Sequence, residues 1–134
     1  MRALGIDYGS VRTGIAGCDE LGMFASPLET VETHKAIQRI CELAQQRQVE
    51  LIVVGMPRNM DGTYGPKCDE VRAFIEKLKI QCNLPIRTWD ERLTTQGVER
   101  MLIDADVSRK KRKEVIDKLA AQQILQSFLD AQTS

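Results

Sequence analysis

Residues 2–18 of this chain read RALGIDYGSVRTGIAGC, and this stretch decides which fold we expect. Apolar residues between Ala3 and Ile6 form a short run that ends on a carboxylate, Asp7. A turn containing Gly9 follows, and a second apolar run then returns. Short connections between such runs favour an antiparallel hairpin and meander. We therefore predict three successive strands, at residues 2–7, 13–18 and about 24–31.

The rest of the chain alternates between helical and strand patterns. Apolar residues at 37, 40, 41 and 44 have helical spacing, and Thr33 is available as the N-cap. Residues 49–56 are apolar apart from Glu50, as expected of a central strand buried on both faces. The further predicted elements are a loop at 57–66, a helix through 71–78, a strand at 85–91, and helices at about 95–103 and 108–131.

This order of elements predicts an α/β fold. Three sequential strands followed by alternating helices and strands imply a mixed five-stranded sheet, antiparallel then parallel, with helices on both faces. A chain of 134 residues has room for one domain, which we place at residues 1–134. Because this architecture hosts several chemistries, the function has to be inferred from the site.

Composition excludes several classes of protein. Apolar residues make up 43% of the chain, too many for a disordered protein. The longest apolar stretch, Leu51–Met56, is too short to span a membrane, and no signal peptide is recognisable, so we expect a soluble cytoplasmic protein without a membrane partner. Four scattered cysteines and one histidine provide no zinc site, and we expect the cysteines to be reduced thiols. The net charge is zero, although residues 109–113 are five consecutive cations.

Carboxylates close two of the predicted strands. Asp7 ends the first strand beside a glycine-containing turn, where a ligand can approach closely, although an acid before such a turn also serves as a simple cap. Asp90 and Glu91 close the last strand. Since neighbouring side chains on a strand point to opposite faces, at most one of this pair shares the face of Asp7, and their order in the sequence leaves open which one.

Asp117 lies on the apolar stripe of the last predicted helix. Ala121, Ile124 and Phe128 follow it at +4, +7 and +11. An acid on such a stripe costs free energy unless it is paired or holds a metal, and the small Ala120 and Ala121 would let the helix approach the sheet closely. The alternative is that Asp117 interacts with the helix dipole or with Lys113.

Together these acids predict a site for a hard cation. Oxygen ligands without cysteine or histidine select Mg²⁺ or Mn²⁺. Such an ion lowers the pKa of an attacking water and neutralises charge on a phosphate, which suits hydrolysis of a phosphodiester bond. No Ser/His/Asp or Cys/His set is available for covalent acyl chemistry.

Four motifs resemble those of the YqgF (RuvX) family, in order and over essentially the whole chain. They are GIDYGSVRTGIA at 5–16, GMPRNMDGT at 55–63, DERLTT at 90–95 and DKLAAQQIL at 117–125. The resemblance implies an RNase H-like fold related to RuvC-type Holliday junction resolvases. It also implies a nuclease that processes the 5′ end of pre-16S ribosomal RNA in ribosome biogenesis.

The same resemblance implies the site residues. The catalytic acids fall on Asp7, Asp90 or Glu91, and Asp117, with Asp7, Glu91 and Asp117 as the metal ligands. RuvC-type enzymes carry a further acid after the last one, but Lys118 follows here, which leaves the number of metal ions open. The cations in or beside the motif loops are candidates for phosphate contacts: Arg12, Arg58, Lys67 and Arg92.

Three other hypotheses remain at this point. The substrate could be branched DNA rather than RNA, in which case a twofold dimer is expected; the sequence is compatible with a monomer or a homodimer. A second hypothesis is a nucleic-acid-binding factor without turnover. The third is ATP binding of the actin and sugar-kinase type, since a strand, an aspartate and a glycine turn also open that superfamily, but a single domain of this length cannot enclose the nucleotide.

Overall fold

The computed structural model describes residues 1–58, 61 and 63–90, and the backbone of 109–133 with side chains from 115 to 132. Its strands are β1 (Ala3–Asp7), β2 (Arg12–Cys18), β3 (Ala25–Glu32), β4 (Leu51–Met56) and β5 (Ile86–Asp90). Its helices are the short η1 (Thr33–Lys35), then α1 (Ala36–Gln46), α2 (Pro66–Cys82) and α4 (Arg109–Thr133). The predicted helix at 95–103 lies outside the described residues.

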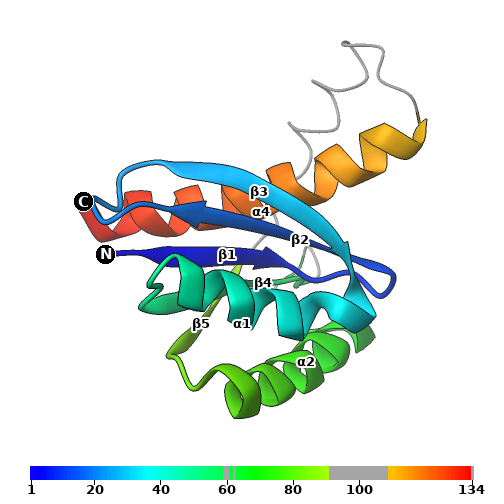
Figure 1. The fold of residues 1–134 in the computed structure, drawn as a ribbon. Helices are drawn as coiled ribbons and strands as arrows, with labels where there is room; N and C mark the ends of the chain where they lie inside the picture. Colours follow the sequence, from blue (N-terminus) through cyan, green and yellow to red (C-terminus); the bar gives the residue numbers. More distant parts are fainter. Residues whose placement is uncertain (59–60, 62, 91–108, 134) are drawn as a thin grey trace.

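The five strands form one mixed sheet in the order β3-β2-β1-β4-β5. β1 pairs antiparallel with β2, and β2 with β3, whereas β1–β4 and β4–β5 are parallel. α1 and α2 lie on one face of the sheet and α4 lies on the other (Figure 1). The prediction of an antiparallel meander followed by parallel strands, with helices on both faces, is therefore confirmed.

Each face of the sheet has its own hydrophobic core. On the α1–α2 face, Leu4 and Ile6 of β1 pack with residues of both helices. On the α4 face, Ala3 and Val53 pack against the buried stripe of α4, which includes Ile124. Strand residues alternate between the two cores because successive side chains point to opposite faces. This alternation determines which predicted site residues can meet.

Two local predictions were wrong. Thr33 does not cap α1, whose N-cap is Lys35; its hydroxyl instead donates to the carbonyl oxygen of Gly9 at 2.5 Å, because β3 continues beside the β1–β2 turn. Cys41 and Cys82 form a disulfide, with their Cα atoms 5.4 Å apart. The sequence gives no sign of this pair, because only the packing of α1 on the end of α2 brings the two cysteines together.

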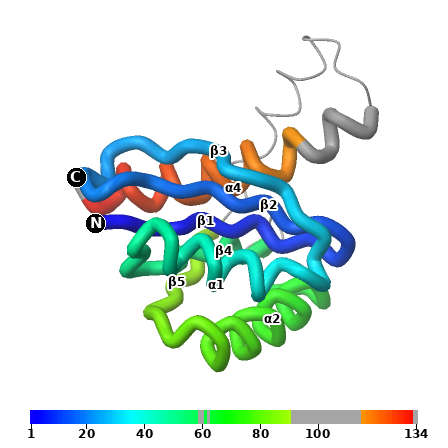
Figure 2. Tube along the Cα trace, viewed as in Figure 1, coloured from blue at the N-terminus to red at the C-terminus, as the bar shows by residue number. Residues whose placement is uncertain are grey.

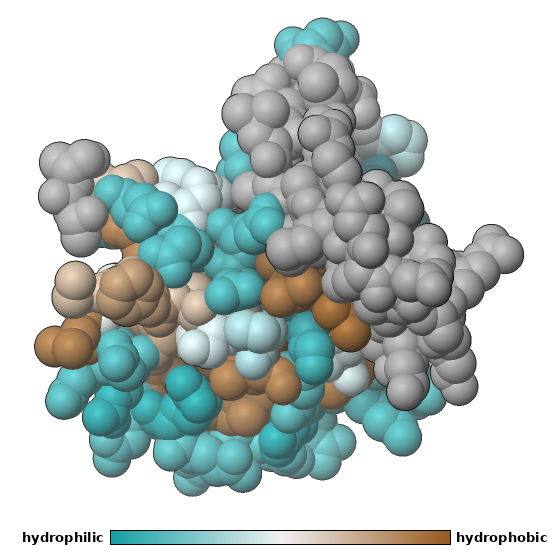
Figure 3. Space-filling view, turned by 90° about the horizontal axis from the view of Figure 1, so that it is seen from above, coloured by the Kyte–Doolittle hydropathy of each residue, from teal (hydrophilic) through white to brown (hydrophobic). Residues whose placement is uncertain are grey.

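The two chain ends described here lie at the same end of the sheet, opposite the carboxyl end of β1 (Figure 2). Seen from above, hydrophilic residues cover much of the surface and hydrophobic areas interrupt them (Figure 3). Three large apolar side chains of the β2–β3 turn are exposed: Leu21, Met23 and Phe24. No helix in the described part of the chain is long and apolar enough to cross a membrane.

Candidate active site

Asp7 ends β1 on the face of the sheet that α4 covers. Its register partner in β2 is Gly14, and paired residues of an antiparallel ladder project to the same face. A Cβ built on Gly14 would lie 1.9 Å from the backbone oxygen of Asp117. Gly5, two residues before Asp7, likewise lies under α4, since its Cβ would lie 2.6 Å from Cβ of Leu125. Asp7 therefore projects toward α4.

Asp117 is brought to the same place by the packing of α4 on glycine. Its backbone occupies the space that any larger residue at position 14 would fill, directly beside the partner of Asp7. Ala120 and Ala121 are fully buried, so α4 keeps this close approach along its next turn, as their small size predicted. Two acids that are 110 positions apart in sequence thus lie on one face, at one end of the sheet.

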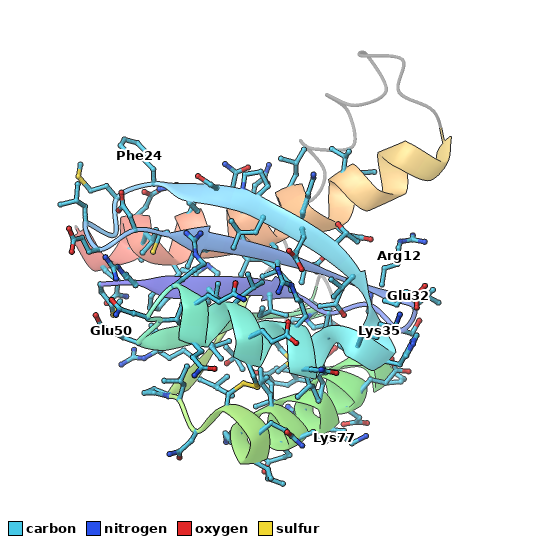
Figure 4. All side chains as sticks on the ribbon, in the orientation of Figure 1. Arg12, Phe24, Glu32, Lys35, Glu50 and Lys77 are labelled. Atoms are coloured by element: carbon cyan, nitrogen blue, oxygen red, sulfur yellow. A yellow bond between two sulfur atoms is a disulfide. The ribbon has the colours of Figure 1, made fainter. Side chains whose placement is uncertain are left out.

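Arg12 pairs with Asp117. The Arg12 Nε atom donates to Oδ2 of Asp117 at 3.0 Å, with the two side chains 34% and 21% exposed. Figure 4 shows Arg12 at the end of the sheet, near Glu32 and Lys35. Because the pair is partly shielded from water, its attraction is stronger than that of a fully exposed pair. Arg12 is therefore a direct electrostatic partner of one predicted catalytic acid.

Thr33 positions the turn that carries Arg12. Besides its bond to Gly9, the Thr33 hydroxyl lies 2.8 Å from the hydroxyl of Thr13, and its amide donates to the carbonyl oxygen of Val11 at 2.9 Å. Thr13 is fully buried. These bonds tie the start of η1 to both sides of the β1–β2 turn. The sequence pattern, a threonine before a helix, suggested only a cap.

Asp90 lies on the opposite face of the sheet from Asp7. Trp89, immediately before it, points toward α4: its indole N–H donates to Ser127 at 2.9 Å and its ring meets Phe128 edge-on. Strand alternation then directs Asp90 toward α2, where its Oδ2 lies 3.7 Å from a guanidinium nitrogen of Arg58.

The other predicted cations have different surroundings. Arg58 stands 4.8 Å from the ring centre of Tyr64, in a cation–π contact. Lys67 is exposed in the first turn of α2. Glu91 and Arg92 lie outside the described residues. The basic run at 109–113 opens α4, but its side chains are also outside the described part.

Asp7 and Asp117 are the described residues that could hold a metal ion. Within the described part of the chain, no group of three or more histidine, cysteine, aspartate or glutamate side chains is close enough to hold a metal ion. Asp7 and Asp117 nevertheless have the chemistry that a hard cation requires, since both are carboxylates at one end of one face. Because Mg²⁺ usually keeps several water ligands, one or two carboxylates are enough to hold it beside a phosphate.

The sequence matches a known protein family over nearly its whole length. The family model described as "RuvX: Holliday junction resolvase" matches residues 1–131. A protein of Desulforamulus reducens named "Putative pre-16S rRNA nuclease" is 50% identical over 134 residues, covering 98% of both chains. A protein of Listeria monocytogenes with the same name is 49% identical over 135 residues, covering 97% of this chain and 98% of the relative.

Solved structures of low sequence identity share the fold. The fowlpox virus resolvase in complex with Holliday junction DNA has a TM-score of 0.64 at 10% identity, and both chains are covered completely. Thermus thermophilus RuvC in complex with its junction substrate has a TM-score of 0.56 at 17% identity, covering 100% of this chain and 97% of that one. These similarities confirm the RNase H-like fold class. The family model covers residues 1–131, and the relatives are about half identical over nearly their full length, so the chain belongs to the RuvX family.

Proposed function

We propose that this protein is a metal-dependent nuclease that hydrolyses phosphodiester bonds in the 5′-end processing of pre-16S rRNA, in the cytoplasm. The single observation that carries the proposal is the packing of Asp117 of α4 onto Gly14, the register partner of Asp7. This packing gathers acids of distant sequence position at the carboxyl end of β1. We infer the substrate from the relatives, which are named as putative pre-16S rRNA nucleases.

The residues present fit a Mg²⁺ or Mn²⁺ ion. Asp7 and Asp117 supply hard oxygen ligands, and we propose Glu91 as the third. Asp90 is the weaker candidate because it points to the α2 face and pairs with Arg58. The bound ion would supply an attacking water of lowered pKa and would neutralise charge on the phosphate.

Arg12 contributes in two ways to this site. Its hydrogen bond to Oδ2 of Asp117 fixes the orientation of that carboxylate, and thereby also the position of Oδ1. A guanidinium beside the acids also offsets their mutual repulsion and the negative charge of a phosphate at the same place. We therefore assign Arg12 both to positioning Asp117 and to the phosphate of the substrate.

The direct test is cleavage of a purified pre-16S rRNA by Asp7→Asn and Asp117→Asn variants. Both substitutions preserve side-chain size and remove the charge, so folding should persist while cleavage in Mg²⁺ or Mn²⁺ is lost. Glu50→Gln is the matched control, because Glu50 is exposed at the other end of the molecule from Arg12 (Figure 4). Undiminished cleavage by Asp7→Asn, or equal cleavage in EDTA, would eliminate the proposal.

A second substrate is favoured by the description of the family model as a Holliday junction resolvase. The same acids could hydrolyse a branched DNA, and symmetric cleavage would then require a homodimer. A four-way DNA junction and the rRNA precursor should be compared under identical conditions, with the oligomeric state measured by sedimentation. Preferential, symmetric cleavage of the junction by a dimer would favour DNA as the substrate.

A further inference from the structure

A cavity on the α2 face lies beside the end of β5 and is separate from the acids under α4. Its volume is about 420 Å³, and its lining includes Met56 of β4, Thr88 and Asp90 of β5, and several residues of α2. This volume lies within the range of small-molecule sites. Tyr64, which precedes α2, also lines the cavity and is 53% exposed.

Two guanidinium groups flank an aromatic ring in this cavity. The carbon atoms at the centres of the Arg58 and Arg72 guanidiniums each lie 4.8 Å from the ring centre of Tyr64. Planar guanidiniums and aromatic rings are the two kinds of surface on which proteins stack nucleobases. Tyr64 precedes α2 and Arg72 lies on this helix, so the segment before the helix and its second turn meet at this ring.

Charges of both signs line the same space. Lys79 joins the two arginines as a third cation, and its Nζ lies 3.5 Å from Oε1 of Glu76. Asp90 is the second acid of the lining. Cations of this kind bind phosphate, whereas a carboxylate accepts hydrogen bonds from the amino group of a base. The cavity therefore combines a group for each part of a nucleotide.

We propose that this cavity binds one nucleotide of the substrate strand, at a position some way along the strand from the cleaved bond. The inference rests on the proposed nuclease function, which makes a nucleic acid the partner. The base stacks on a guanidinium group that packs against Tyr64, Asp90 accepts from its amino group, and Lys79 contacts the phosphate.

The sheet places this subsite relative to the catalytic acids. β4 separates β1 from β5, so the strand ends carrying Asp7 and Asp90 are two strand spacings apart, roughly 10 Å. Asp7 faces α4 and the cavity faces α2, so a bound strand has to pass around the end of β4 and β5. A single-stranded or unpaired segment can bend in this way more readily than a continuous duplex.

The test uses direct nucleotide binding as its main measurement. Isothermal titration calorimetry with nucleoside 5′-monophosphates should show binding to the wild-type protein. Tyr64→Leu removes the ring against which both guanidiniums pack and should weaken binding about tenfold or more, since loss of one aromatic side chain from a stacked site has effects of that order. Tyr64 is exposed, so the circular dichroism spectrum should not change.

A matched pair of lysines on α2 provides the control. Lys79 lines the cavity, whereas Lys77 is exposed two residues away and lines a different surface, toward α1. Lys79→Gln should weaken binding of the monophosphates and Lys77→Gln should not. Equal effects of the two substitutions, or unchanged binding by Tyr64→Leu, would overturn the proposal.

Two further measurements separate the possible outcomes. A single-stranded RNA hexamer should compete with the monophosphates for the cavity; if it does not, the site serves a free nucleotide and the proposal is overturned. Tyr64→Leu should raise KM for the rRNA precursor more than it lowers kcat. Asp7→Asn should retain monophosphate binding while losing cleavage, so failure of the proposed nuclease function is detected independently of failure at this cavity.

Discussion

Gly14→Ala tests the contact on which the candidate site depends. The added Cβ would lie 1.9 Å from the backbone oxygen of Asp117 and 2.2 Å from its carbonyl carbon. Cβ atoms essentially never approach other heavy atoms within 3.0 Å, so α4 and β2 have to separate by about 1 Å at this point. The opposing atoms belong to a helix backbone and not to a flexible side chain, so a rotamer change cannot relieve the clash.

The expected effect is larger on activity than on stability. Overpacking at a close backbone contact costs about 1–3 kcal/mol of unfolding free energy. For a chain of this length the melting temperature should fall by roughly 3–10 °C. A misplacement of about 1 Å between catalytic groups can lower the rate about 100-fold. We therefore expect kcat/KM for the rRNA precursor to fall by about two orders of magnitude in a protein that is still folded.

Gly17→Ala is the control on the same strand. Its added Cβ would lie 3.0 Å from Leu28 Cδ1 and 3.2 Å from Arg47 Nε, which are outer atoms of flexible side chains on the opposite face. Calorimetry and single-turnover cleavage should therefore show little change for this variant. If Gly14→Ala has the melting temperature and kcat/KM of the wild type, then α4 does not hold Asp117 beside Asp7 as described.

Three other outcomes follow from the structure. Arg12→Gln should slow cleavage strongly, yet lower the unfolding free energy in urea by at most about 1 kcal/mol, since its pair with Asp117 is partly exposed; equal activity would contradict its role. Reducing the Cys41–Cys82 bond, whose cysteines are 41 positions apart, should lower the unfolding free energy by about 2–4 kcal/mol, and an unchanged urea midpoint in reductant would refute this. Burial raises the pKa of Cys18 above 9.0, so the folded state keeps a proton that the unfolded state releases, and this contribution to stability is lost as the pH rises above that value. The melting temperature should therefore fall less with alkaline pH in Cys18→Ala than in the wild type.

The fold was largely predictable because its signals are local. Alternation and apolar runs located the five strands to within about two residues, and helical spacing located α1 and α2. The beginning of α2 was not predicted: the helix starts at Pro66, which was expected to lie in the loop at 57–66. Proline is favoured in the first turn of a helix, so Pro66 was a start signal rather than a loop residue.

The site was predictable in its acids but not in its supporting residues. The stripe of α4 placed Asp117 toward the sheet, and the small Ala120 and Ala121 indicated a close approach. Gly14 could have predicted the contact with Asp117, since a glycine inside a strand often marks close approach of another backbone. Thr33 and Tyr64 could not be found in this way, because their roles depend on segments distant in sequence.

Trp89 attaches the last residues of β5 to α4. Its indole bond to Ser127 and its edge contact with Phe128 fix β5 to the C-terminal half of α4, whereas Gly14 fixes the helix near Asp117. α4 is thus held against the sheet at two separate points along its length. Because the next residue after Trp89 is Asp90, the same strand carries a contact with α4 and a residue of the α2 cavity. The proposed nucleotide subsite therefore shares β5 with one of the two contacts that hold α4, and with it Asp117, against the sheet.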